Sequence, residues 1–86
     1  MYSIRFCPQS RRQFLRLPAE IRKAIGPRLR RLANWPETGL DVKPLRGELA
    51  GSFRLRVGDY RVIFVVDDTA KAISIRKVGH RESVYG

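Results

Sequence analysis

The stretch FRLRVGDYRVIFVV, residues 53–66, decides the fold because it holds two strands and the turn between them. FRLRV alternates apolar and basic residues, and RVIFVV is an apolar run with the length of a buried strand. Gly58 and Asp59 separate the runs, and glycine at the first position is typical of a two-residue hairpin turn. We therefore predict an antiparallel hairpin.

This turn predicts the pairing of the two strands. Val57 should face Tyr60, and Arg56 should face Arg61. The apolar positions of both strands then share the face toward the core, which comprises Phe53, Leu55, Val57, Tyr60, Val62 and Phe64. Arg54, Arg56 and Arg61 share the other face, and like charges directly opposite each other destabilise a sheet by up to about 1 kcal/mol. One exposed arginine is usually a solvating residue, but three together indicate an anion site.

Upstream of the hairpin, the sequence predicts a short strand and two helices. Tyr2–Phe6 alternates as a strand, and Ser10–Leu17 follows with Pro8 at a position that a first helical turn tolerates. A second helix, Pro18–Trp35, carries apolar residues at a 3.6-residue period. The dipeptide Gly26-Pro27 should kink or break this helix, because proline has no N–H to donate. Residues 36–44 read as a polar loop.

Downstream, Asp67–Ala70 predicts a second turn, and Ala72–Val78 predicts the last strand. Ile63 and Val65, on the side of Arg61, suggest that this face is partly apolar and is covered by the tail or by a partner. The expected fold is α+β, with the order β-α-α-β-β-β. Two helices should pack on a small twisted antiparallel sheet in a single domain of residues 1–86.

Composition limits the function. The net charge is +10, and fourteen of the eighteen basic residues are arginine, which binds phosphate through two parallel hydrogen bonds. This charge predicts a polyanionic partner. Binding to a membrane surface would need a basic helix with a bulky exposed apolar face, and the sequence shows none. The single cysteine, Cys7, has no partner for a disulfide or a zinc site. We expect a cytoplasmic protein with no metal and no cofactor.

The tail adds His80, Arg81 and Tyr85 directly after the last strand. A lone histidine or terminal tyrosine is more often structural. Together with the arginines, these residues suit cleavage of a phosphodiester without a metal. Guanidinium groups would hold the phosphate, a base would take the 2′-hydroxyl proton, and an acid would protonate the leaving 5′-oxygen.

Two segments, KPLRGELAGSFRLRVGDYRVIFVVDD and IRKVGHRESVY, closely resemble the RelE/ParE superfamily of type II toxin–antitoxin toxins. The resemblance covers nearly the whole chain and is densest from Lys43 to Tyr85. It implies a helical hairpin against a twisted sheet. For RelE-like members it implies a ribosome-dependent endoribonuclease that cuts mRNA in the A site. It also implies an acidic RelB-like antitoxin, with operator DNA bound through the toxin–antitoxin complex.

The resemblance also implies roles for individual residues. Arg61 would clamp the phosphate, Arg81 would stabilise or protonate the leaving oxygen, and Tyr85 would orient the 2′-hydroxyl or stack on a base. Arg54 and Arg56 stand where the best-known RelE enzymes have lysines, and arginine cannot act as a base, so the base is either His80 or Tyr85. Further RNA contacts are expected at Lys43, Arg46 and Lys77.

Two other functions fit the same residues. ParE-like toxins share the fold but lack the full catalytic set and inhibit DNA gyrase. A degenerate RNA-binding module would keep the basic face without cleavage. The presence of Arg61, Arg81 and Tyr85 favours the endoribonuclease.

Overall fold

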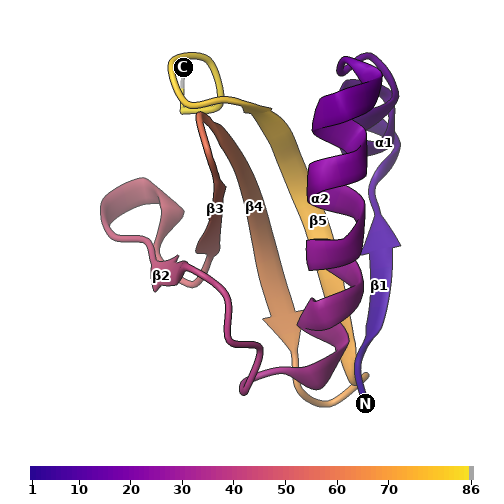
Figure 1. Ribbon diagram of the computed structural model, residues 1–86. Helices are drawn as coiled ribbons and strands as arrows, with labels where there is room; N and C mark the ends of the chain where they lie inside the picture. The colour runs from indigo at the N-terminus through magenta and orange to yellow at the C-terminus, as the bar shows by residue number, and fades with distance from the viewer. Residues whose placement is uncertain (86) are drawn as a thin grey trace.

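Two helices cover one side of a five-stranded sheet in a computed structural model that describes residues 1–85 (Figure 1). The strand order across the sheet is β1-β5-β4-β3-β2. The elements in chain order are β1 (Ser3–Phe6), α1 (Pro8–Leu15), α2 (Ala19–Arg31), η1 (Leu32–Asn34), β2 (Val42–Pro44), η2 (Gly47–Leu49), β3 (Phe53–Val57), β4 (Tyr60–Asp67) and β5 (Ala72–His80). The predicted α+β class is confirmed.

The central hairpin has the predicted register. Val57 pairs with Tyr60 and Arg56 pairs with Arg61. Gly58 has a positive φ of 58°, as the first position of the favoured hairpin turns requires. The second predicted turn also forms, at residues 68–71 and thus one residue later than predicted. The Asp67 carboxylate accepts hydrogen bonds from the backbone N–H groups of Thr69 and Ala70.

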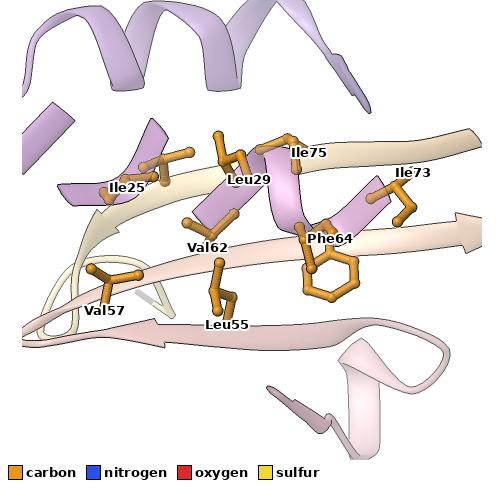
Figure 2. Packing of buried hydrophobic residues seen from close by; sticks show 10 residues of the cluster. Ile25, Leu29, Leu55, Val57, Val62, Phe64, Ile73 and Ile75 are labelled. Carbon is orange, nitrogen blue, oxygen red and sulfur yellow. The ribbon is translucent and has the colours of Figure 1, made fainter. Parts of the chain in front are cut away.

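The core lies between α2 and the sheet (Figure 2). Ile25 and Leu29 of α2 are buried against strands β3, β4 and β5, each of which contributes alternate apolar residues. Phe64 is fully buried, and the ring of Trp35 meets it edge-on at a centroid distance of 5.5 Å. The core residues of the strands are Leu55, Val57, Val62, Phe64, Ile73, Ile75 and Val78.

The helices differ from the prediction at two places. The first helix spans Pro8–Leu15 rather than Ser10–Leu17. The second helix, predicted as Pro18–Trp35, runs through Pro27 without a break and ends at Arg31, so the predicted break is wrong. A proline in a helix interior costs about 3 kcal/mol or more. Here Ile25 and Leu29, both buried, hold the helix on the sheet on either side of the proline.

The sheet also differs in two respects. β1 pairs with β5 in parallel, so the sheet is mixed rather than antiparallel throughout. β1 and β5 are far apart in sequence, so no tight turn dictates an antiparallel direction. The expected loop of residues 36–44 contains β2, which adds a short antiparallel edge strand beside β3.

Helix α1 protects the free edge of β5 beyond the end of β1. Ser10 is fully buried, and its Oγ donates a 2.6 Å hydrogen bond to the Ile75 carbonyl. Gln13 Oε1 accepts a 2.9 Å hydrogen bond from the Val78 N–H. Side chains thus satisfy backbone groups that an edge strand would otherwise expose. Among the described residues, neither helix has the length and apolar character needed to cross a bilayer.

Candidate functional site

The sheet face opposite the helices carries a row of side chains that the strand register aligns. Lys43 of β2 pairs with Arg54 of β3, and Arg54 pairs with Ile63 of β4. Ile63 in turn pairs with Lys77 of β5. Side chains of directly paired residues project from the same face of a sheet. The structure thus brings together three of the predicted RNA contacts. We call this surface the basic face, formed by Lys43, Arg54, Arg56, Arg61, Ile63 and Lys77.

A second row runs beside the first and contains the Arg56–Arg61 pair. The Arg56 N–H donates a 3.0 Å hydrogen bond to the Asp41 carbonyl, so its backbone groups point toward β2 and away from β4. Arg56 and Arg61 therefore form a non-hydrogen-bonded pair, the kind in which Cα atoms lie about 4.5 Å apart and side chains are closest. Beyond Arg61, the row ends at Gly79 of β5.

The three arginines differ in how far the fold neutralises them. Arg54 forms an ion pair with Asp41 at 3.2 Å, and its side chain is only 13% exposed. The Arg61 guanidinium donates to the carbonyls of Gly58 at 2.8 Å and Tyr60 at 2.9 Å, which orient it but do not offset its charge. Arg56 is exposed and has no ionic partner among residues 1–85. The predicted anion site of three arginines therefore also holds a carboxylate, which neutralises Arg54.

The apolar part of the basic face lies beneath η2. Ile63 is 2% exposed and lines a hollow of about 290 Å³ together with Leu49 of η2 and Lys77. Cover for Ile63 was expected from the tail or a partner, but the segment between β2 and β3 lies there instead. Val65 is partly buried. Arg46 is exposed at the start of η2, outside the two rows.

Cys7 lines the same hollow, at the N-cap of α1. Hydrogen bonding with Ser10 lowers the pKa of the Cys7 thiol below its ordinary value of 9.0, and the positive charge of Arg76 acts in the same direction. The backbone N–H of Ser10 also contributes a hydrogen bond, which favours the thiolate over the thiol, as the Arg76 charge does. Cys7 is thus partly exposed at the rim of the basic face.

The chain after β5 forms a turn beside the hairpin. The Arg81 N–H donates a 2.8 Å hydrogen bond to the Asp59 carbonyl, so the turn begins next to the hairpin tip. Val84 is buried, and its Cβ lies 3.9 Å from where a Cβ on Gly79 would stand. Gly79 pairs with Arg61, so this contact anchors the turn at the end of the second row. Tyr85 is 47% exposed and Arg81 is exposed.

His80 is not brought to the arginines. It pairs with Tyr60, whose side chain lies on the helix-facing side of the sheet, and the two rings meet edge-on at 5.5 Å. Its Nδ1 accepts a 3.2 Å hydrogen bond from the Glu82 N–H. This geometry places His80 where it can support the turn that carries Arg81 and Tyr85.

Two residues of α1 and its C-cap residue join the site without having been predicted. Gln9, Gln13 and Arg16 line a hollow between α1 and the C-terminal turn, next to Lys77. Their spacing of four and three residues puts them on one helical face. That spacing was visible in the sequence, but nothing in the sequence indicated which element this face would meet.

The fold and the basic face together define a small α+β protein with positive charge concentrated on one face of its sheet. A family model described as "ParE toxin of type II toxin-antitoxin system, parDE" matches residues 4–85. The chain therefore belongs to this family of toxins, within the RelE/ParE superfamily.

Relatives and solved structures agree with this assignment. The chain is 37% identical over 85 residues to Toxin RelG of Mycobacterium tuberculosis, covering 98% of this chain and 95% of the relative. The toxin–antitoxin complex RelBE2 from the same organism contains a chain that is 37% identical, with a TM-score of 0.81 over 93% of this chain and 98% of that chain. Isolated Escherichia coli RelE, at 20% identity, shares the fold with a TM-score of 0.78, over 99% of this chain and 92% of that chain.

Proposed function

We propose that this toxin is a ribosome-dependent endoribonuclease that cleaves mRNA in the A site by attack of a 2′-hydroxyl on the adjacent phosphate. The Arg56–Arg61 pair carries the proposal. Its two positive charges lie side by side on the basic face. Within residues 1–85 the only ion pair joins Arg54 to Asp41, so neither Arg56 nor Arg61 has a carboxylate partner. Folding gains nothing from this arrangement, whereas a bound phosphate would be stabilised by both guanidinium groups.

Each residue then has a role that its position supports. Arg61, oriented by the Gly58 and Tyr60 carbonyls, holds the scissile phosphate and stabilises the charge that develops on its oxygens. Arg81, tied to the hairpin tip through its backbone, stabilises the leaving 5′-oxygen. Tyr85 is exposed in the same turn, and as its phenolate it orients the 2′-hydroxyl and takes its proton. The leaving 5′-oxygen takes a proton from water.

The remaining predicted residues hold the RNA or the turn. Arg56, Lys43 and Lys77 bind the RNA backbone along the two rows, and Arg54 contributes to a lesser extent because Asp41 offsets its charge. Arg46, exposed before η2, contacts ribosomal RNA outside the rows. His80 acts as a positioning residue rather than the base, through its ring contact with Tyr60 and its bond to the Glu82 N–H.

The proposed setting is the cytoplasm, with an acidic RelB-like antitoxin as the inhibitor. A chain with a net charge of +10 pairs tightly with a partner of opposite charge. The solved complex RelBE2 contains a relative of this chain together with an antitoxin. Operator DNA would be bound through the antitoxin, which supplies the DNA-reading element.

One observation favours a second function. The matching family model is that of ParE toxins. The resemblance to ParE-like toxins implies inhibition of DNA gyrase without catalysis. For a gyrase inhibitor, the basic face would be a protein-binding surface, and loss of the Tyr85 hydroxyl would have little effect.

A translation extract with purified toxin separates the two functions. The endoribonuclease produces mRNA fragments whose new ends lie within A-site codons, and Arg61→Gln or Tyr85→Phe removes them. Arg5→Gln, a matched loss of one charge on β1, leaves them in place because Arg5 lies outside both rows. Stalled gyrase–DNA cleavage complexes in a parallel assay, without mRNA fragments, would instead establish gyrase as the target.

A further inference from the structure

A hollow of about 370 Å³ adjoins the basic face between α1 and the C-terminal turn. Its volume lies within the range of ligand pockets, about 300–1,000 Å³. Lys77 belongs to both the hollow and the basic face, and Gly79, which pairs with Arg61, forms part of the lining. A molecule bound on the basic face can therefore extend into this hollow past Lys77, on the strand next to Arg61.

The hydrogen-bonding pattern of Gln13 is set by the fold. Its Oε1 accepts the hydrogen bond from the Val78 N–H at 2.9 Å, so the carbonyl end of the amide is turned toward β5. The Nε2 end, which carries two N–H donors, remains for the hollow that Gln13 lines. Arg16 and Lys77 add cationic donors, and neither forms an ion pair within the described part of the chain.

We propose that this hollow binds one nucleotide of single-stranded RNA, next to the phosphate held by Arg56 and Arg61. Arg16 and Lys77 bind its phosphate, and Gln13 Nε2 donates to an acceptor atom on its base. Val84 packs over Gly79 and also lines the hollow, so a planar base can lie against this apolar side of the C-terminal turn. The inference rests on the proposed function for the direction of the RNA, but the binding itself can be tested without cleavage.

Gln13 gives the hollow a base preference. Uracil presents an O4 acceptor where cytosine presents an N4 amino donor, and the two bases are otherwise the same size. With Gln13 Nε2 directed at position 4 of the base, its N–H pairs with the uracil O4 and repels the cytosine N4 amino group. The free chain should therefore bind uridine-rich RNA roughly 2- to 10-fold more tightly than cytidine-rich RNA, the effect of one hydrogen bond.

The test uses fluorescence anisotropy with 5′-fluorescein hexamers of uridine and of cytidine, 2′-O-methylated throughout so that they cannot be cleaved. Gln13→Glu is the decisive variant. It keeps an oxygen to accept the Val78 N–H but replaces the donor amide with an acceptor. The uridine preference should be lost or reversed in this variant, while the midpoint of thermal unfolding stays the same.

Arg16→Gln and Lys77→Gln test the phosphate contacts, with Arg11→Gln as the matched control. Arg11 lies on the same helix but does not line the hollow. The first two variants should weaken the binding of both hexamers equally, and more than the control does.

The inference is overturned if Gln13→Glu keeps the wild-type ratio, if Arg16→Gln and Lys77→Gln match the control, or if wild-type protein binds neither hexamer. Cleavage in a translation extract reports on the proposed function separately, so loss of cleavage with this binding pattern intact would refute the endoribonuclease and leave the nucleotide site.

Discussion

Replacing Arg56 with threonine should make the folded protein more stable. Two guanidinium charges about 7 Å apart in water repel each other by about 0.6 kcal/mol. This agrees with the effect of up to about 1 kcal/mol for like charges directly opposite across strands. Arg56 and Arg61 form a non-hydrogen-bonded pair, in which side chains lie closer together than in a hydrogen-bonded pair. Arg56→Thr should thus raise the free energy of unfolding by about 0.5 kcal/mol at low salt, while abolishing toxicity.

Urea denaturation at 50 mM and 1 M NaCl measures this effect. With an m-value of about 1 kcal/mol/M, the gain appears as a midpoint shift of about 0.5 M urea. It should disappear at 1 M NaCl, where the screening length is about 3 Å. Arg5→Thr is the matched control, because Arg5 pairs with the uncharged Ser74 in the same sheet. Arg56→Lys should show no gain. A gain that persists at 1 M salt, or that Arg5→Thr reproduces, would refute the argument that Arg56 and Arg61 repel each other in the free protein.

Three further results are expected. Ser10→Ala removes a buried hydrogen bond to the Ile75 carbonyl and should lower the free energy of unfolding by about 1–2 kcal/mol in urea; an unchanged midpoint would contradict the role of α1 in closing the sheet edge. Asp41→Asn should change stability by less than about 1 kcal/mol, because Asp41 is half exposed, yet it should tighten RNA binding in anisotropy by freeing Arg54; weaker binding would count against an RNA role for Arg54. Alkylation of Cys7 by iodoacetamide should titrate below the ordinary thiol pKa of 9.0, and Ser10→Ala should move that midpoint to higher pH, since hydrogen bonding with Ser10 is the largest cause of the lowered pKa; equal midpoints in both proteins would contradict this.

The hairpin and its basic face were predictable because local rules determine both. A two-residue turn sets the register, and alternation along FRLRV then assigns every side chain to a face. The opposition of Arg56 and Arg61 follows from these rules alone. The pairing of β5 is not set by a turn alone, because β5 pairs in parallel with β1 and with β4 through a shift in register. The prediction included neither feature.

A bulge in β5 explains why the position of His80 could not be predicted. The pairing of β4 with β5 shifts between Ile63 and Phe64, so that Arg76 is an extra residue on β5. A shift of one residue moves every later side chain to the opposite face. Lys77 therefore joins the basic face, and His80 lies beside Tyr60 on the helix side. No turn residue or glycine near Arg76 signals this shift in the sequence.

The ion pair between Arg54 and Asp41 was missed for a related reason. Asp41 directly precedes β2, and β2 is only three residues long and lacks an alternating pattern. Strand β2 forms because β3 has a free edge with which it can pair. That edge is a property of the assembled sheet and not of residues 42–44. Long-range pairing of this kind leaves no local sequence signal.

The bulge also joins the fold to the proposed chemistry. By shifting β5, it puts Gly79, rather than a side chain, opposite Arg61, and Val84 of the C-terminal turn packs beside that glycine. The same shift turns Val78 into the core, and α1 binds its N–H through Gln13. The two elements that flank the Arg56–Arg61 pair, the C-terminal turn and α1, are thus both anchored on residues 78–79. The charge repulsion that the pair imposes on the free protein is small beside the burial of the core on the other face, so the sheet can keep an anion site on one side and its stability on the other.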